Sequence, residues 1–243
     1  MRRVALCLVL AACGSPAQEE TSPDAPAVTP DAAIDSSGAL AGFGDLSGMC
    51  GVLGAQDLTG ASPELIRATM TFMRRYNDPA DRPLLTIGGQ HLAETPNAGG
   101  SSGLSEIFAY EELARCEHAT LLKTETEIVY DTAGKITDLE IELAGHKVGV
   151  SVTRAVAFPF GSEYTLAAAT TLVEKKLSDI QMSSANVSAA DAWDKQILAV
   201  LAWDGAAADT FAQAWQMTTP ALKADTIVVI SSTAGEDLFI YDE

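Results

Sequence analysis

Three stretches of alternating apolar and polar residues follow one another closely in the middle of the chain, and they restrict the folds it can adopt. They cover about residues 121–130, 136–143 and 146–155, and the short turns Ala133-Gly134 and Ala144-Gly145 separate them. Alternation with period two is typical of half-buried strands, and short turns join strands that are antiparallel neighbours. The sequence therefore predicts a three-stranded antiparallel meander.

Helical patterns lie on both sides of this meander. A Gly/Ser-rich loop at about 97–103 opens a predicted helix over 104–116, and Thr165 caps a second one that runs to about Met182. Another helix is expected where Ser62-Pro63-Glu64 starts a pattern that continues to Tyr76. Beyond the second helix we expect a strand at 196–203, a helix at 206–217, a buried strand at 226–231 and an edge strand at 238–241. This order predicts an α/β fold in which helices flank both faces of a mixed sheet.

The first thirteen residues, MRRVALCLVLAAC, read as an export signal, with two arginines, a short apolar run and small residues before Cys13. The apolar run is too short to span a membrane as a helix. The final Leu-Ala-Ala-Cys resembles the lipobox of bacterial lipoproteins. That resemblance implies cleavage before Cys13, diacylglycerol on its sulfur and acylation of the new N-terminus. The alternative is an ordinary secretory signal cleaved near Ala12.

The lipobox implies a protein of the cell envelope, anchored by lipid. Gly14 rather than Asp follows the cysteine, and the enteric sorting rule then favours the outer membrane. Residues 14–45 are rich in Ala, Pro, Ser, Thr and Asp, carry acidic charges alone and have no helical or strand period, so they predict a disordered linker. The expected division is a signal peptide at 1–12, the lipidated cysteine and linker at 13–45, and one α/β domain at 46–243.

The chain has 33 acidic and 15 basic residues and a formal net charge of -18. This excess argues against broad nucleic-acid binding, which needs basic surface, and against docking on anionic lipid through charge. The anchor itself predicts a membrane as partner. No motif specifies a protein or small-molecule ligand.

After cleavage at the lipobox, Cys50 and Cys116 are the cysteines of the mature domain. In an oxidising compartment we expect them to form a disulfide, which the chain-entropy model values at roughly 4 kcal/mol for so long a loop. The alternatives are two buried free thiols, or a reactive Cys116 beside His118.

The order of helix, three antiparallel strands, helix and strand, over about residues 104–231, resembles the core of the restriction-endonuclease-like, or PD-(D/E)XK, nucleases. That family carries an acid on the first helix, an Asp at the start of the second strand and an acid-x-Lys on the third. Glu106 and Asp138 match the first two places. Ser151 and Thr153 stand where the acid and the Lys of the third would be.

Two interpretations of this mismatch stay open, because hydroxyls supply neither the anionic ligands nor the cation that Mg²⁺-dependent hydrolysis uses. In the first, Asp138 joins Ser151, Thr153 and Arg154 in a buried polar network, and the domain serves a binding or structural role.

The second interpretation is a metal-dependent nuclease or phosphodiesterase whose Lys has moved to the next helix, where Lys175 and Lys176 lie. Glu125 or Glu127 would then add a carboxylate. Successive helical residues point about 100° apart, so one of the two lysines at most can serve. Mg²⁺ is expected under this interpretation alone.

Other reactive patterns are weak. Gly99-Gly100-Ser101-Ser102-Gly103 matches G-x-S-x-G, but a turn precedes it rather than the strand that a nucleophile elbow requires. His91, His118 and His146 lie far apart without metal-ligand spacing, so we predict no metal site and no cofactor for the non-catalytic domain.

Overall fold

The structure of the protein is a computed structural model that describes residues 39–40, 42–96 and 103–242. The predicted signal peptide, Cys13 and the linker up to residue 38 lie outside the described residues. Ser101 of the G-x-S-x-G sequence lies outside them as well. No helix in the described part is long and apolar enough to cross a membrane.

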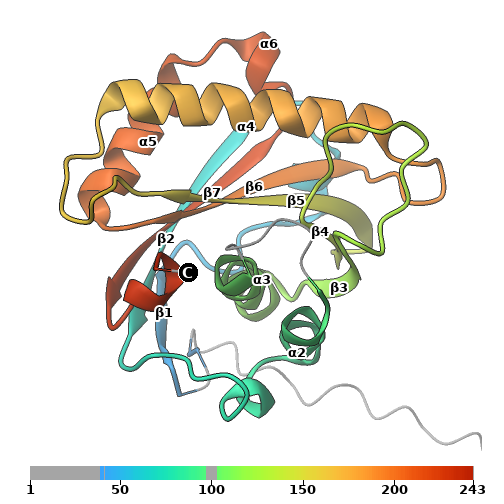
Figure 1. Cartoon of the computed structure of the whole chain (residues 1–243). Helices are drawn as coiled ribbons and strands as arrows, with labels where there is room; N and C mark the ends of the chain where they lie inside the picture. The colour runs from blue at the N-terminus through green and yellow to red at the C-terminus, as the bar shows by residue number, and fades with distance from the viewer. Residues whose placement is uncertain (1–38, 41, 97–102, 243) are drawn as a thin grey trace, which may run out of the picture. The chain divides into compact units, whose positions relative to one another are not determined.

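A seven-stranded mixed sheet with the order β1-β2-β7-β6-β5-β4-β3 forms the centre of the described fold (Figure 1). β2, β7, β6 and β5 pair in parallel, while β1, β4 and β3 extend the two sides by antiparallel pairing. The strands are β1 (Gly44–Gly48), β2 (Glu64–Phe72), β3 (Thr120–Thr124), β4 (Leu139–Leu143), β5 (His146–Ala155), β6 (Lys195–Ala202) and β7 (Ile227–Gly235).

Helices cover both faces of this sheet, with α4 and α5 on one side and α2 and α3 on the other (Figure 1). The helices are α1 (Ala55–Thr59), α2 (Ile87–Glu94), α3 (Gly103–Glu117), α4 (Leu166–Asn186), α5 (Gly205–Met217) and α6 (Pro220–Lys223), with 3-10 turns at Arg82–Leu84 and Leu238–Ile240. The predicted α/β class, a mixed sheet flanked by helices, is confirmed.

Each face of the sheet has its own apolar core. On one face, Val148 and Val150 of β5 pack with Leu113 of α3. On the other, Val200 of β6 packs with Val173 of α4 and Phe211 of α5. The central strands are therefore buried on both sides, as is typical of parallel sheets.

Apart from the short helix α6, the element order from α3 to β7 is the predicted one, and β5 has the predicted bounds. Thr165 caps α4 as expected, because its hydroxyl accepts a hydrogen bond from the amide of Ala168 at 3.3 Å. The first strand of the meander ends at Thr124, earlier than its alternation suggests, because the chain turns there and the amide of Glu127 donates to the Thr124 carbonyl.

The helix predicted from Ser62 to Tyr76 is wrong, because most of this segment forms β2. Ile66, Met70 and Phe72 are buried, and alternate residues of the strand are more exposed. This segment is a strand rather than a helix because it pairs with β1 on one edge and β7 on the other. The predicted edge strand at 238–241 is also wrong, since residues 238–240 form a 3-10 turn.

The folded region begins before residue 46. Leu40 and Phe43 are each 1% exposed, and β1 begins at Gly44. The Phe43 ring packs edge-on against Phe108 of α3, with ring centroids 5.8 Å apart. These two apolar side chains interrupt the polar linker pattern and anchor its end to the core, so the boundary predicted at residues 45–46 lies too late.

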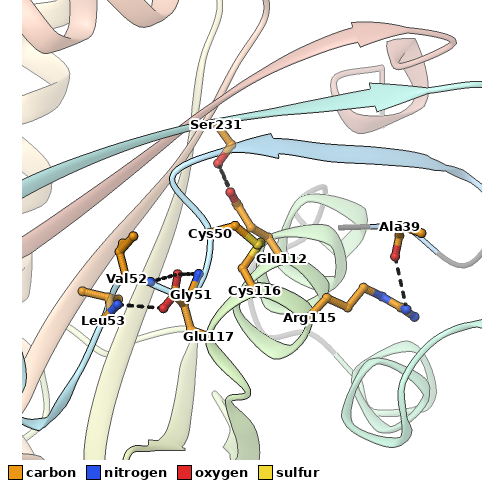
Figure 2. The surroundings of a disulfide bond; sticks show 10 residues. All are labelled: Ala39, Cys50, Gly51, Val52, Leu53, Glu112, Arg115, Cys116, Glu117 and Ser231. Atoms are coloured by element: carbon orange, nitrogen blue, oxygen red, sulfur yellow. Dashed lines mark hydrogen bonds between the residues drawn. A yellow bond between two sulfur atoms is a disulfide. The ribbon is translucent and has the colours of Figure 1, made fainter. Parts of the chain in front are cut away.

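The disulfide predicted between Cys50 and Cys116 is present and joins residues 66 positions apart (Figure 2). The neighbouring Glu117 carboxylate accepts hydrogen bonds from the amides of Gly51 at 2.9 Å and Leu53 at 2.8 Å. The last turn of α3 therefore holds the chain after β1 both covalently and by hydrogen bonds. The alternatives of two free thiols and of a reactive Cys116 beside His118 are wrong.

Glu112, one turn before Cys116, is a buried carboxyl in the middle of the fold. Its two oxygens lie 2.6 and 2.5 Å from the Ser231 hydroxyl of β7, whose single proton is donated to the carboxyl group (Figure 2). Burial raises the pKa of Glu112 to about 7, and this outweighs the stabilisation of the carboxylate by the Ser231 hydrogen bond.

We expect the double variant Cys50→Ser, Cys116→Ser to lose roughly 4 kcal/mol of unfolding free energy, because the denatured chain gains the entropy of an open loop. Urea denaturation of the variant and of the oxidised protein measures the difference. The reduced wild-type protein is the control and should match the variant. Equal stability of the variant and the oxidised protein would contradict the prediction.

We expect the wild-type protein to lose about 2–3 kcal/mol of stability between pH 5 and pH 8 through Glu112, whose folded pKa lies above its unfolded value. The protonated form is favoured by folding, so its stabilisation is lost as the pH rises through about 7. Glu112→Gln should flatten this part of the pH profile. Glu142→Gln, on the exposed side of β4, is the matched control and should leave the profile unchanged.

Candidate functional site

A cavity of about 580 Å³ lies beside the start of β4 and the middle of α4. Four of the residues predicted from the resemblance to nucleases line it: Asp138, Ser151, Lys175 and Lys176. The full set of lining residues is Glu125, Gly134, Lys135, Ile136, Asp138, Ser151, Lys175, Lys176 and Asp179. We refer to it as the Asp138 cavity.

Asp138 precedes β4 and bonds to β5 through its main chain and its side chain. Its amide donates to the Val150 carbonyl at 3.1 Å, and its Oδ2 accepts from the Val152 amide at 2.5 Å. Burial raises the pKa of Asp138, and the nearby Glu125 carboxylate adds to this rise. The Lys176 charge and the Val152 amide oppose it, because both favour the carboxylate.

The two candidate lysines point in different directions. Lys176 donates to the Val152 carbonyl at 2.7 Å, whereas Lys175 has 61% of its side chain exposed and pairs with Asp179 at 2.8 Å. Lys135 also pairs with Asp179, at 3.2 Å. Lys176 is therefore the lysine that faces Asp138.

The structure gives a reason for these contacts. β4 pairs with β5 as far as the Leu139–Val150 pair, so the Val152 amide and carbonyl extend beyond the end of β4. An unpaired buried backbone group costs about as much free energy as a lost hydrogen bond. Asp138 accepts from the Val152 amide and Lys176 donates to its carbonyl, so the two side chains replace the missing strand.

The polar network predicted from Ser151, Thr153 and Arg154 does not form as one unit. The Ser151 and Thr137 hydroxyls lie 3.0 Å apart and are buried, and Thr153 lies on the same side of β5. Arg154 donates instead to the Ile240 carbonyl at 3.2 Å. Successive residues of a strand point to opposite faces, so the Arg154 side chain lies on the other face of β5 from Ser151 and Thr153.

Glu106 lies in the first turn of α3 and is buried, but it does not reach the Asp138 cavity. It lines a second cavity of about 220 Å³ together with Tyr76 and Asp78. Glu125 lines both cavities and lies between the two acids of the nuclease pattern. The two acids that match that pattern line different cavities, which have Glu125 in common.

The Mg²⁺ that the resemblance implies does not fit these residues. The described residues contain no group of three or more Asp, Glu, His or Cys placed to hold a metal ion. One oxygen of Asp138 is bonded to a backbone amide, and the Ser151 hydroxyl is neutral. Hard divalent cations prefer several anionic oxygens. Three carboxylates line this cavity, but Asp179 is paired with Lys175 and Lys135, and Asp138 is bonded to the backbone.

The remaining sequence candidates have structural partners. Glu127 accepts from the Thr124 amide at 2.9 Å and lies 3.1 Å from His91 Nε2, so it is not a ligand in the Asp138 cavity. His146 Nδ1 lies 2.9 Å from Asp194 Oδ2. Among the described residues, these histidines form separate polar pairs.

Sequence reasoning missed Thr137, Lys135 and Asp179 as parts of this site. Asp179 had a usable signal, because it lies four residues after Lys175 on a helix and such charges pair. Thr137 and Lys135 had none, because they lie outside the strands and approach the cavity through the turn before β4.

No protein-family model matches the chain. A relative from Dictyostelium discoideum, the AAC-rich mRNA clone AAC4 protein, is 37% identical over 163 residues, which cover 64% of this chain and 24% of that protein. The chain thus spans about a quarter of that relative's length. A structure of SfsA from Pyrococcus furiosus in complex with Ca²⁺ is similar over 54% of this chain and 56% of its own, with 11% identity and a TM-score of 0.28.

We expect Lys176→Met to lower the unfolding free energy by about 2–3 kcal/mol, because it leaves the Val152 carbonyl without its donor and Asp138 without its counter-charge. The folded pKa of Asp138 then rises further, so the loss should be larger at pH 8 than at pH 5.

Lys175→Met is the matched control, since it removes the same charge from an exposed position. It should change stability by less than about 0.5 kcal/mol. Denaturant titrations of both variants at the two pH values measure the effect. Equal losses in the two variants would contradict the role given to Lys176.

Proposed function

We propose that the protein is a lipid-anchored protein of the cell envelope whose α/β domain is not catalytic and serves a binding or structural role. One observation carries the non-catalytic part. The carboxylate of Asp138 and the ammonium of Lys176 both bond to the backbone of Val152, and the Ser151 hydroxyl lies against Thr137. Groups used to complete the sheet are not free to bind a metal or activate water.

Two features support the location. The Cys50–Cys116 disulfide is typical of an oxidising compartment outside the cytoplasm. The lipobox-like sequence ending at Cys13 suits a protein retained at a membrane after export, and Gly14 favours the outer membrane under the enteric rule. The net charge of -18 also makes a polyanionic substrate unfavourable.

A second candidate function, a metal-dependent phosphodiesterase with a displaced Lys, has one observation in its favour. Lys176, Asp138 and Glu125 line the same cavity, so a cation and two carboxyls are near one another. The poor fit to Mg²⁺ counts against it.

An activity assay separates these candidates. We expect the purified protein to show no cleavage of single- or double-stranded DNA or of RNA with Mg²⁺ or Mn²⁺, because Asp138 and Lys176 bond to the backbone and the described residues hold no metal-binding group of acids. Turnover that disappears in Asp138→Ala and Lys176→Ala, but persists in the exposed control Lys175→Ala, would overturn the non-catalytic proposal and support the phosphodiesterase.

Anchoring has its own test. We expect metabolic labelling with a radioactive fatty acid to mark the wild-type protein and not Cys13→Ser, because the thiol carries the diacylglycerol. Cys7→Ser removes a cysteine from the signal peptide and is the matched control, which should label like the wild type. Equal labelling of wild type and Cys13→Ser would reject the anchor.

A further inference from the structure

Apolar side chains are exposed just beyond the carboxyl ends of the parallel strands. Met73 comes directly after β2, and Leu238 lies in the 3-10 turn after β7. Phe158 and Phe160 lie in the loop after β5, and Phe158 is 63% exposed. Trp203 follows β6 directly and is partly exposed. We call these five side chains the apolar row.

The order of the strands brings these side chains to one end of the sheet. β2, β7, β6 and β5 are neighbours in that order and run parallel, so their carboxyl ends lie together (Figure 1). Neighbouring strands are ~4.8 Å apart, so the row spans roughly 14 Å. The Phe160 ring contacts Phe158 at 4.7 Å and Trp203 at 5.1 Å between centroids. Trp203 in turn contacts Tyr241 at 5.1 Å, whose amide donates to the Leu238 carbonyl.

The N-terminal side of the chain joins the domain at this same end of the sheet. Gly44 begins β1 beside the last residue of β2. The Met73 amide donates to the Phe43 carbonyl at 2.7 Å, so the chain that leads into β1 lies against the apolar row. Residues 14–38, which lie outside the described structure, connect this place to Cys13. A lipid anchor on Cys13 would therefore attach this end of the domain to the membrane.

A lipid surface is a suitable partner for such a row. Aromatic rings are enriched at the boundary between headgroups and acyl chains, where their apolar bodies leave water. Interfacial binding strength grows with the apolar area that enters this boundary. A tether raises the effective concentration of one surface at the other, so a few side chains suffice to orient a domain that is already anchored.

The charges beside the row indicate which kind of lipid it fits. Glu163 and Glu236 are exposed and lie in the loops after β5 and β7. Arg74 and Arg75, next to Met73, are each paired with an aspartate, at 2.6 and 3.7 Å. Anionic lipids attract unpaired basic groups and repel carboxylates. The row therefore suits neutral, zwitterionic phospholipid.

We propose that the apolar row docks on a bilayer surface of neutral phospholipid, with Phe158 and Met73 as the most exposed contacts. The domain then stands with the carboxyl ends of its parallel strands toward the membrane. This inference rests on the lipid anchor of the proposed function, and it adds the face that the domain turns to the lipid.

Photocross-linking in phosphatidylcholine vesicles tests the docking. The lipidated full chain, purified from the membranes of the cells that export it, carries p-benzoylphenylalanine in place of Phe158 or of Met217. Met217 is the matched control, because it is 66% exposed and ends α5, which begins beside the carboxyl end of β6 and extends roughly 18 Å away from it. We expect the probe at 158 to label lipid about tenfold more than the probe at 217.

A substitution tests whether the row acts as one surface. With the probe in place of Leu238, Phe158→Ser should lower lipid labelling about three- to tenfold, because it removes an exposed aromatic ring from the same row. Met217→Ser makes a similar change outside the row and should leave the labelling unchanged. Both positions are exposed, so denaturant titration should show that the two variants are as stable as the wild type.

Sedimentation of the chain with the vesicles separates failure of the anchor from failure of the docking. If the chain sediments with vesicles but the probes at 158 and 217 label lipid equally, the anchor stands and the docking is overturned. Cross-linking of the probe at 158 to a second copy of the chain instead of to lipid has the same meaning. If the chain does not sediment with vesicles, the anchor fails and the docking falls with it. Stronger labelling from vesicles that contain phosphatidylglycerol would overturn the assignment to neutral lipid.

Discussion

The pairing of β5 on both of its edges is the interaction on which the described fold depends. β5 pairs with β4 from His146 to Val150 and with β6 from Val148 to Ala155, so it joins the antiparallel meander to the parallel strands. The two ladders do not cover the same residues. The end of β5 extends past β4, and its backbone groups there need other partners.

This mismatch explains the use of Asp138 and Lys176. Their positions match places that carry chemistry in the nucleases the sequence resembles, yet here both side chains bond to Val152. A carboxylate or an ammonium that completes a sheet is held in one orientation by its backbone partner. Its hydrogen bond then stabilises the fold instead of binding a substrate. The same residue types in the same order thus support a structural role.

The sequence predicted most of what lies between α3 and β7, because there the hydrophobic period changes cleanly from helix to strand and turns mark the boundaries. It failed at β2, where apolar residues satisfy a helical stripe and a strand alternation at once and only pairing with β1 and β7 decides. The inward direction of Lys176 rather than Lys175 was not predictable either, since it depends on how α4 rotates over the sheet.

The disulfide has a mechanical consequence when the chain is pulled from its N-terminal side. A pull on the N-terminal side reaches the domain at Ala39, whose carbonyl accepts from Arg115 at 3.4 Å, and then passes along β1 to Cys50 (Figure 2). There the covalent bond transfers the tension directly to Cys116 of α3. The chain between these two cysteines, which includes β2 and α2, is bypassed and cannot be drawn out. The segment between the two cysteines therefore bears no tension, whereas β3 to β7 follow Cys116 in the chain and are not shielded by the disulfide.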